Sequence, residues 1–156
     1  MTTPFLIDDL KRDEGLRLKA YPDPLSGGDP WTIGYGHTGI RIRRGVTCTL
    51  EDAEFWLEAD VGFVEARLDA QIPWWSSLDD VRQDVLAEMA FNLGVLGLLE
   101  FEVMLTDARL GRYDMAAAAM LFSEWARQVG DRAMRLSILM KTGVRPTPKP
   151  PKGDRT

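Results

Sequence analysis

The sequence predicts an α+β fold in which a mainly helical lobe carries a small three-stranded antiparallel sheet lobe. Apolar residues recur at helical spacing before residue 15 and again after residue 49. Between these stretches, strand-favouring aromatic and branched residues alternate with closely spaced prolines and glycines, which is typical of short strands joined by turns. The chain has 156 residues and no internal repeat, so one domain is expected.

The first helix is expected over residues 3–14. An apolar stripe runs from Phe5 to Leu10, and Gly15 follows at the position where a helix commonly ends. The helix therefore presents Glu14 in its last turn.

The small β lobe is expected over about residues 16–45. Ile40–Arg43 alternates apolar and polar residues, which is the period of a half-buried strand. An antiparallel sheet of about three strands is predicted here. The strand-favouring residues earlier in the segment are Tyr21, Trp31, Ile33 and Tyr35.

The remaining elements are predicted to be helices. Thr49–Asp52 resembles a capping box and opens a long helix, which Pro73 ends. Residues 77–80 open another helix, with Gly94 as its C-cap. Shorter helices are expected at about residues 103–110, 114–127 and 131–142.

The folded domain is expected to span residues 1–143. The remainder, residues 144–156, is rich in proline and has no apolar pattern with which to build a core. It is predicted to be a flexible tail.

The charge and hydropathy of the chain argue against some classes of protein. Lys and Arg total 19 against 24 Asp and Glu, a formal net charge of −5, whereas nucleic-acid-binding proteins usually have a basic excess. No apolar run approaches the roughly 20 residues that a membrane helix needs. The charged N-terminus is unlike a signal peptide. We therefore expect no nucleic-acid partner, no membrane insertion and no signal peptide.

One histidine and one cysteine limit the chemistry further. His37 and Cys48 do not make a zinc ligand set, so no metal and no cofactor are expected. No Gly-x-Ser-x-Gly elbow is present, and Cys48 has no base beside it. His37 is instead expected to be a structural, hydrogen-bonded residue that joins the lobes.

Two carboxylates near the N-terminus suit glycoside hydrolysis, which needs one protonated and one ionised carboxyl group. Glu14 suits the role of the protonated group. The last turn of a helix presents unpaired carbonyls and the negative end of the macrodipole, which disfavour a carboxylate there. Asp23 follows in a proline-flanked turn, where backbone N–H groups and water keep a carboxylate ionised. Each alone is an ordinary helix-end or turn residue, so only their combination indicates this chemistry.

An ordered set of motifs carries a family resemblance. Glu14-Gly15, Tyr21-Pro22-Asp23 and Thr32–Thr38 (Thr-Ile-Gly-Tyr-Gly-His-Thr) together resemble the signature of the phage-type lysozyme family, glycoside hydrolase family 24. A looser similarity continues through Phe91–Gly94 and from Arg132 to Gly143. The resemblance implies a lysozyme-like α+β fold, in which a long helix joins the two lobes and the active-site cleft lies between them.

The resemblance also implies roles for individual residues. Glu14 would be the general acid, and Asp23 would orient or activate the attacking water or stabilise positive charge at the anomeric carbon. Thr32 would help to hold that water through its hydroxyl. The outcome in this family is inversion, which needs carboxyl groups about 6.5–9.5 Å apart. The substrate contacts that the resemblance implies are Thr38, Phe91 and Asn92.

The turn after the first strand departs from the family pattern. It is longer in this chain and contains Asp29, which competes with Asp23 for the role of second carboxylate. The Tyr-x-Asp context and the spacing from Glu14 favour Asp23.

The last helix departs from the pattern as well. The family commonly sets an arginine of this helix beside the catalytic glutamate, and the matching position is Lys141. Lysine lacks the planar fork of arginine. Either Arg132 or Arg135 takes its place, or the acid is tuned differently.

The leading hypothesis is an endolysin that acts as a muramidase on the β-1,4 bond between N-acetylmuramic acid and N-acetylglucosamine of bacterial peptidoglycan, for host cell lysis. The protein is expected to be a monomer that waits in the host cytoplasm until a holin lets it reach the cell wall. One alternative is a catalytically inactive peptidoglycan-binding or phage structural module with the same fold. Another is a related glycosidase that acts on chitin or chitosan.

Overall fold

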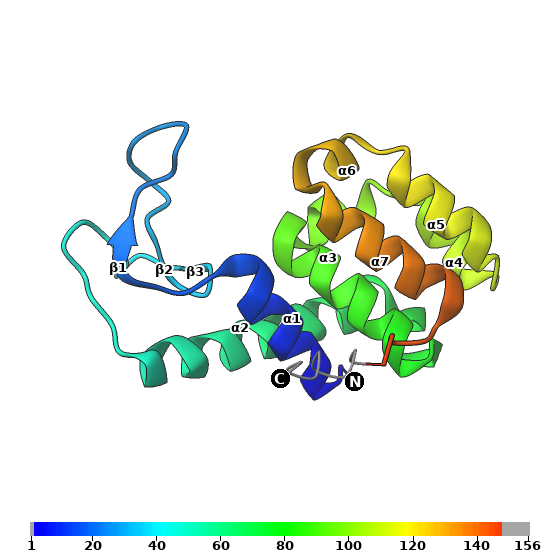
Figure 1. The fold of residues 1–156 in the computed structure, drawn as a ribbon, viewed down its shortest axis with the longest axis horizontal. Helices are drawn as coiled ribbons and strands as arrows, with labels where there is room; N and C mark the ends of the chain where they lie inside the picture. The colour runs from blue at the N-terminus through cyan, green and yellow to red at the C-terminus, as the bar shows by residue number, and fades with distance from the viewer. Residues whose placement is uncertain (1, 148–156) are drawn as a thin grey trace, which may run out of the picture.

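The structure, a computed structural model, describes residues 2–147 and shows two lobes joined by a long helix (Figure 1). In this part of the chain the sheet lobe has three strands and the remainder is mainly helical, which confirms the predicted α+β class. In chain order the elements are α1 (Pro4–Glu14), β1 (Arg17–Tyr21), β2 (Thr32–Gly34), β3 (His37–Thr38), α2 (Leu50–Gln71), the 3₁₀ helix η1 (Pro73–Ser77), α3 (Asp80–Leu99), α4 (Glu102–Arg109), α5 (Tyr113–Leu121), α6 (Glu124–Val129) and α7 (Asp131–Thr142).

Helix α1 ends where the sequence predicts. Gly15 takes a φ of 69° as the C-cap and donates its backbone N–H to the carbonyl of Lys11. Leu6 and Leu10 are buried in the main core, whereas Phe5 lies at the surface. Glu14 is therefore the last residue of a helix that is fixed by its buried face.

The sheet is antiparallel in the order β1-β2-β3, with Tyr21 opposite Thr32 and Thr32 opposite Thr38. The prediction of a strand over 40–43 is wrong, because the third strand lies earlier, at His37–Thr38. After β3 the chain turns, and the backbone N–H of Ile42 bonds to the carbonyl of Gly39 instead of joining the ladder.

The small lobe has its own apolar core and rests on α2. Ile42 is buried with Ala20 and Ile33, whereas Ile40 is fully exposed. Gly34 approaches α2 so closely that a Cβ there would lie 3.1 Å from the Cβ of Ala53. The sheet is thus seated directly on the helix that joins the lobes.

His37 has the structural role that was expected of it. Its Nδ1 lies 2.8 Å from Oδ2 of Asp60, and its ring stacks on Trp56 with centroids 4.7 Å apart. Both partners are on α2, so His37 fastens β3 to the joining helix. Helix α2 begins with the predicted capping box, in which Thr49 and Asp52 exchange backbone-to-side-chain hydrogen bonds.

In the helical lobe one predicted helix is divided into two, and another is interrupted at Gly94. The single helix predicted over 114–127 is wrong: α5 ends at Leu121, and Ser123 then caps α6 by accepting a hydrogen bond from the backbone of Ala126. Gly94 leaves helical geometry at φ 74°, ψ 156°, and the chain then resumes a short helical segment up to Leu99.

The chain beyond α7 returns towards α1. Arg145 lies with one guanidinium nitrogen 2.7 Å from Asp9 and another 2.7 Å from Asp84. The part of the predicted flexible tail at 148–156 lies outside the described residues. Among the helices of residues 2–147, none alone has the length and apolar character to cross a membrane. Helices α3 and α4 together have the required length and apolar character, but the chain bends by 104° between them.

Candidate active site

Glu14 stands at the junction of the two lobes, at the end of α1. Its side chain is 20% exposed. Burial raises the pKa of this carboxyl above its ordinary value, the Arg132 guanidinium acts in the opposite direction, and the charge of Asp13 adds to the upward shift. The upward shift prevails, which is what a group that must deliver a proton requires.

Arg132 of α7 is the cation beside this acid. Its Nη1 and Nη2 donate to Oε1 of Glu14 at 3.2 and 3.3 Å. The match of Lys141 to the family's arginine is therefore wrong, and Arg132 occupies that place. The nine residues from Arg132 to Lys141 correspond to two and a half helical turns and about 13 Å of rise, so Lys141 is exposed on another part of α7.

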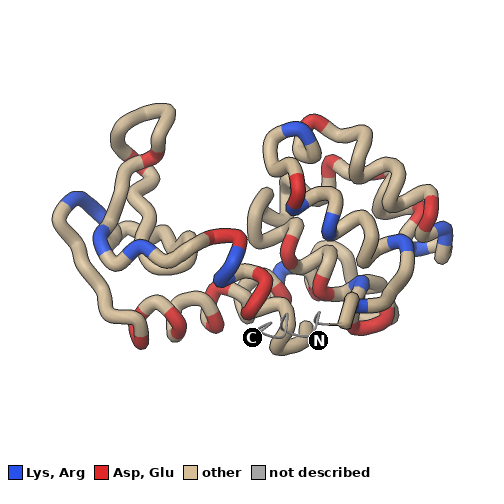
Figure 2. The backbone as a smooth tube through the Cα atoms, in the orientation of Figure 1, with Lys and Arg blue, Asp and Glu red and all other residues tan. Residues whose placement is uncertain are grey.

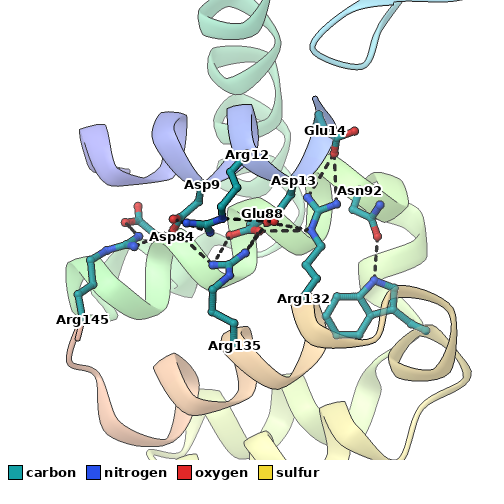
Figure 3. A network of polar contacts seen from close by, with 11 residues as sticks. Asp9, Arg12, Asp13, Glu14, Asp84, Glu88, Asn92, Arg132, Arg135 and Arg145 are labelled. Carbon is teal, nitrogen blue, oxygen red and sulfur yellow. Dashed lines mark hydrogen bonds and ion pairs between the residues drawn. The ribbon is translucent and has the colours of Figure 1, made fainter. Parts of the chain in front are cut away.

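A network of charged residues continues from this pair (Figure 3). Figure 2 shows acidic and basic residues gathered where α1 meets the helical lobe. Arg135 bonds both to Asp13 of α1 and to Glu88 of α3. Glu88 is only 1% exposed, and burial raises its pKa to about 7, with the adjacent Asp13 adding to that shift and Arg135 opposing it.

Glu88 is a residue of this network that was not predicted from the sequence. A signal was present, because Asp84 and Glu88 are one helical turn apart in a segment that also carries Val85 and Met89 on its apolar stripe. An acidic residue within a buried helix needs a compensating cation. The pattern does not reveal which cation, since Arg132 and Arg135 come from a different helix.

The turn between β2 and β3 closes over Glu14. Gly36 has a φ of 75°, and a Cβ built on it would lie 3.0 Å from Oε2 of Glu14. The glycine therefore serves two purposes, a left-handed turn and the close approach of the sheet to the acid.

Asp23 lies in the turn after β1, two residues beyond Tyr21. Its Oδ2 accepts hydrogen bonds from the backbone N–H groups of Leu25 and Ser26, at 3.2 and 2.9 Å. Such bonds are strongest to an ionised carboxylate. Asp29 is exposed in the same turn. Within the described residues, neither aspartate forms a hydrogen bond or ion pair with Glu14.

The remaining predicted site residues form two groups. Thr32 and Thr38 face each other across β2 and β3, so the sheet brings them together, and Tyr21 pairs with Thr32 on its other side. Phe91 is half-buried on α3, and Asn92 beside it is exposed. Asn92 accepts a hydrogen bond from the Trp125 indole at 2.8 Å (Figure 3).

Within residues 2–147, no group of three or more His, Cys, Asp or Glu side chains has the arrangement of a metal site. The arrangement around Glu14 can instead supply a proton from a half-buried carboxyl group and stabilise the carboxylate that remains, through Arg132.

Comparison with known proteins finds a family model that covers most of the chain. The model of the phage lysozyme family matches residues 11–141. The chain is 37% identical to the endolysin of Salmonella phage P22 and 35% identical to the endolysin of Acyrthosiphon pisum secondary endosymbiont phage 1. These alignments cover 74% and 76% of this chain, and 77% and 75% of the two endolysins.

A third relative is a longer protein of another kind. The chain is 32% identical to the pre-baseplate central spike protein Gp5 of Enterobacteria phage T4, over 86% of its own length. It spans only 27% of that spike protein.

Gly36→Ala is expected to lower the free energy of unfolding by about 1–2 kcal/mol, because the new Cβ meets the Glu14 carboxyl group and the left-handed backbone disfavours it. Urea unfolding measures the change. Gly39→Ala is the matched control in the same lobe: its Cβ would meet only Ile42, at 4.0 Å, without a left-handed φ. Equal losses in both variants would contradict the close approach at Gly36.

Glu14→Gln is expected to gain stability relative to the wild type as the pH rises. The folded protein holds the Glu14 proton more tightly than the unfolded chain, so the wild type loses stability as the pH rises from the ordinary value of 4.5 through the folded-state pKa. The amide does not ionise and escapes this loss. Urea unfolding between pH 4 and 8 gives the difference, and an advantage that shrinks with rising pH would contradict the raised pKa.

Proposed function

The chain belongs to the phage lysozyme family, and on that basis we propose that it is a muramidase. Its substrate is bacterial peptidoglycan, in which it hydrolyses the β-1,4 bond between N-acetylmuramic acid and N-acetylglucosamine. The observation that carries the proposal is Glu14, a half-buried carboxyl group with a raised pKa at the end of α1, beside Arg132.

The first half of the reaction uses Glu14. Its protonated carboxyl group donates to the glycosidic oxygen as the bond from that oxygen to the anomeric carbon breaks, and positive charge develops on the sugar. Glu14 is left as a carboxylate. Arg132 stabilises that carboxylate, because its two nitrogens already contact Oε1. Burial keeps the proton on before the transfer, and the guanidinium compensates the charge afterwards.

The second half uses a water on the opposite face of the sugar. Asp23 accepts a proton from this water as its oxygen attacks the anomeric carbon, and the hydroxyl of Thr32 helps to hold it. The product has inverted configuration. The backbone N–H groups of Leu25 and Ser26 hold the Asp23 carboxyl group in the turn through its Oδ2. Thr38, Phe91 and Asn92 would contact the sugar chain.

The relatives that are endolysins support a proposal for the biological setting. The proposed role is lysis of the bacterial host by a monomer without a cofactor, held in the host cytoplasm until a holin opens the way to the wall. The catalytic domain in this proposal comprises residues 1–143.

A second candidate is a peptidoglycan-binding or phage structural module without activity. The similarity to the central spike protein Gp5 favours the structural part of this alternative, because the matching segment there belongs to a longer spike protein. A related glycosidase on chitin or chitosan differs only in its substrate.

Glu14→Gln is expected to slow the clearing of outer-membrane-permeabilised bacteria by about 10²–10⁴-fold, since removal of a general acid has effects of this size. Glu102→Gln, an exposed carboxylate on α4, serves as the matched control and should clear as fast as wild type. Wild type that sediments with purified walls but clears nothing would favour the inactive module. Mass spectrometry of the products from peptidoglycan and chitin oligomers identifies the bond.

Asp23→Asn is expected to lose most of the activity, whereas Asp29→Asn should retain it. The asparagine oxygen can still accept the two backbone hydrogen bonds of the turn, so the change mainly removes the charge. Clearing rates of the two variants, measured side by side, decide between the carboxylates. The reverse result would assign the role to Asp29. NMR of the fresh product at its anomeric centre reports inversion or retention.

A further inference from the structure

Glu88 is a buried carboxyl group that the proposed mechanism does not use. It lies on α3 with a side chain 1% exposed, and the guanidinium groups of Arg132 and Arg135 both reach it (Figure 3). Arg132 Nε donates to its Oε1 at 3.2 Å, and Arg135 Nη1 to its Oε2 at 3.4 Å. A buried carboxyl group between two cations of another helix is costly unless each contact is maintained.

Arg132 connects this group to the acid. One side of its guanidinium, the Nε, faces Glu88 and lies 3.6 Å from Oδ2 of Asp13. The other side, Nη1 and Nη2, faces Oε1 of Glu14. A single rigid plane therefore spans Glu88 and Glu14, and whatever fixes the Nε side also fixes the nitrogens beside the acid.

We propose that Glu88 is a positioning residue for the acid: it holds Arg132 against Glu14, and its charge sets how strongly Arg132 favours the ionised form of Glu14. The inference rests on the proposed function only in taking Glu14 as the proton donor. Glu88 itself does not touch the substrate in this scheme.

The charges that face Glu88 come from each helix packed around it. Helix α1 contributes Asp13, and α7 contributes Arg132 and Arg135. Asp9, also on α1, lies with its Oδ2 3.4 Å from Nη1 of Arg135. On α3 itself, Asp84 is one turn earlier and is paired with Arg145 instead.

The sign of the coupling follows from these neighbours. An ionised Glu88 neutralises part of the positive charge on Arg132, so Arg132 opposes the protonated form of Glu14 less strongly. Burial raises the pKa of Glu88 to about 7, so its charge appears near neutrality. As the pH rises through that value, the new negative charge helps Glu14 to keep its proton. Glu88 thereby extends the range over which the acid is active towards higher pH.

Glu88→Gln tests the coupling, because the amide keeps an oxygen for Arg132 but carries no charge. The Glu14 carboxyl carbon, followed by ¹³C NMR in the protein without substrate, is expected to titrate about 0.5 pH unit or more lower than in wild type. The fall in the clearing rate at alkaline pH should likewise move to lower pH.

Asp84→Asn is the matched control. Asp84 is on the same helix and equally buried, but it bonds to Arg145 and Thr3 and does not contact Arg132. The control is expected to lose stability without moving the Glu14 titration. An unchanged titration in Glu88→Gln, or an equal shift in Asp84→Asn, would overturn the proposal.

If Glu88→Gln does not fold, the titration of the wild-type protein provides a second test of the proposal. Two coupled groups give a titration curve with two steps. The Glu14 carbon should therefore show a second inflection where the Glu88 carbon titrates, and a single inflection would overturn the coupling. Because this reading needs no substrate, a coupled but inactive protein would contradict the muramidase proposal and leave the coupling standing.

Discussion

The contact between Arg132 and the carboxylates of α1 is the constraint on which the rest of the site depends. It ties α1 to α7, and Arg135 repeats the connection through Asp13. Buried ion pairs add little net stability, because desolvation offsets their attraction, yet losing one partner leaves a costly unpaired charge. The network is thus better understood as a means of fixing geometry. It determines where Glu14 lies and what electric field it experiences.

Local signals predict much of the fold. Gly15, the Thr49 capping box and Gly94 each act on backbone groups within a few residues, so the sequence alone locates the ends they set. The predictions that are wrong concern segments whose structure is not set by the local pattern alone. The alternation at 40–43 suggests a strand, but only Ile42 finds a place in the small core. The break between α5 and α6 depends on Ser123, which is one polar residue in an otherwise helical pattern.

The candidate site divides in the same way. The order of motifs predicts Glu14, Asp23 and Thr32 as a set, and the sheet pairing places Thr32 close to the strand that leads to Asp23. The arginine beside the acid could not be assigned, because the choice among the cations of α7 depends on which face of that helix turns inward. Glu88 was missed for a related reason, since its partners are 44 and 47 residues away along the chain.

The course of the chain after α7 has a consequence for how this domain can be built into larger proteins. The guanidinium of Arg145 lies over the ring of Phe5, 5.1 Å from its centroid, so both ends of the described fold meet at the start of α1. Glu14 is at the opposite end of that helix, about 13 Å along its axis. The two ends of the described fold, near Phe5 and Arg145, are thus close together and at the end of α1 that is farther from the acid, an arrangement that favours the joining of further domains and circular permutation.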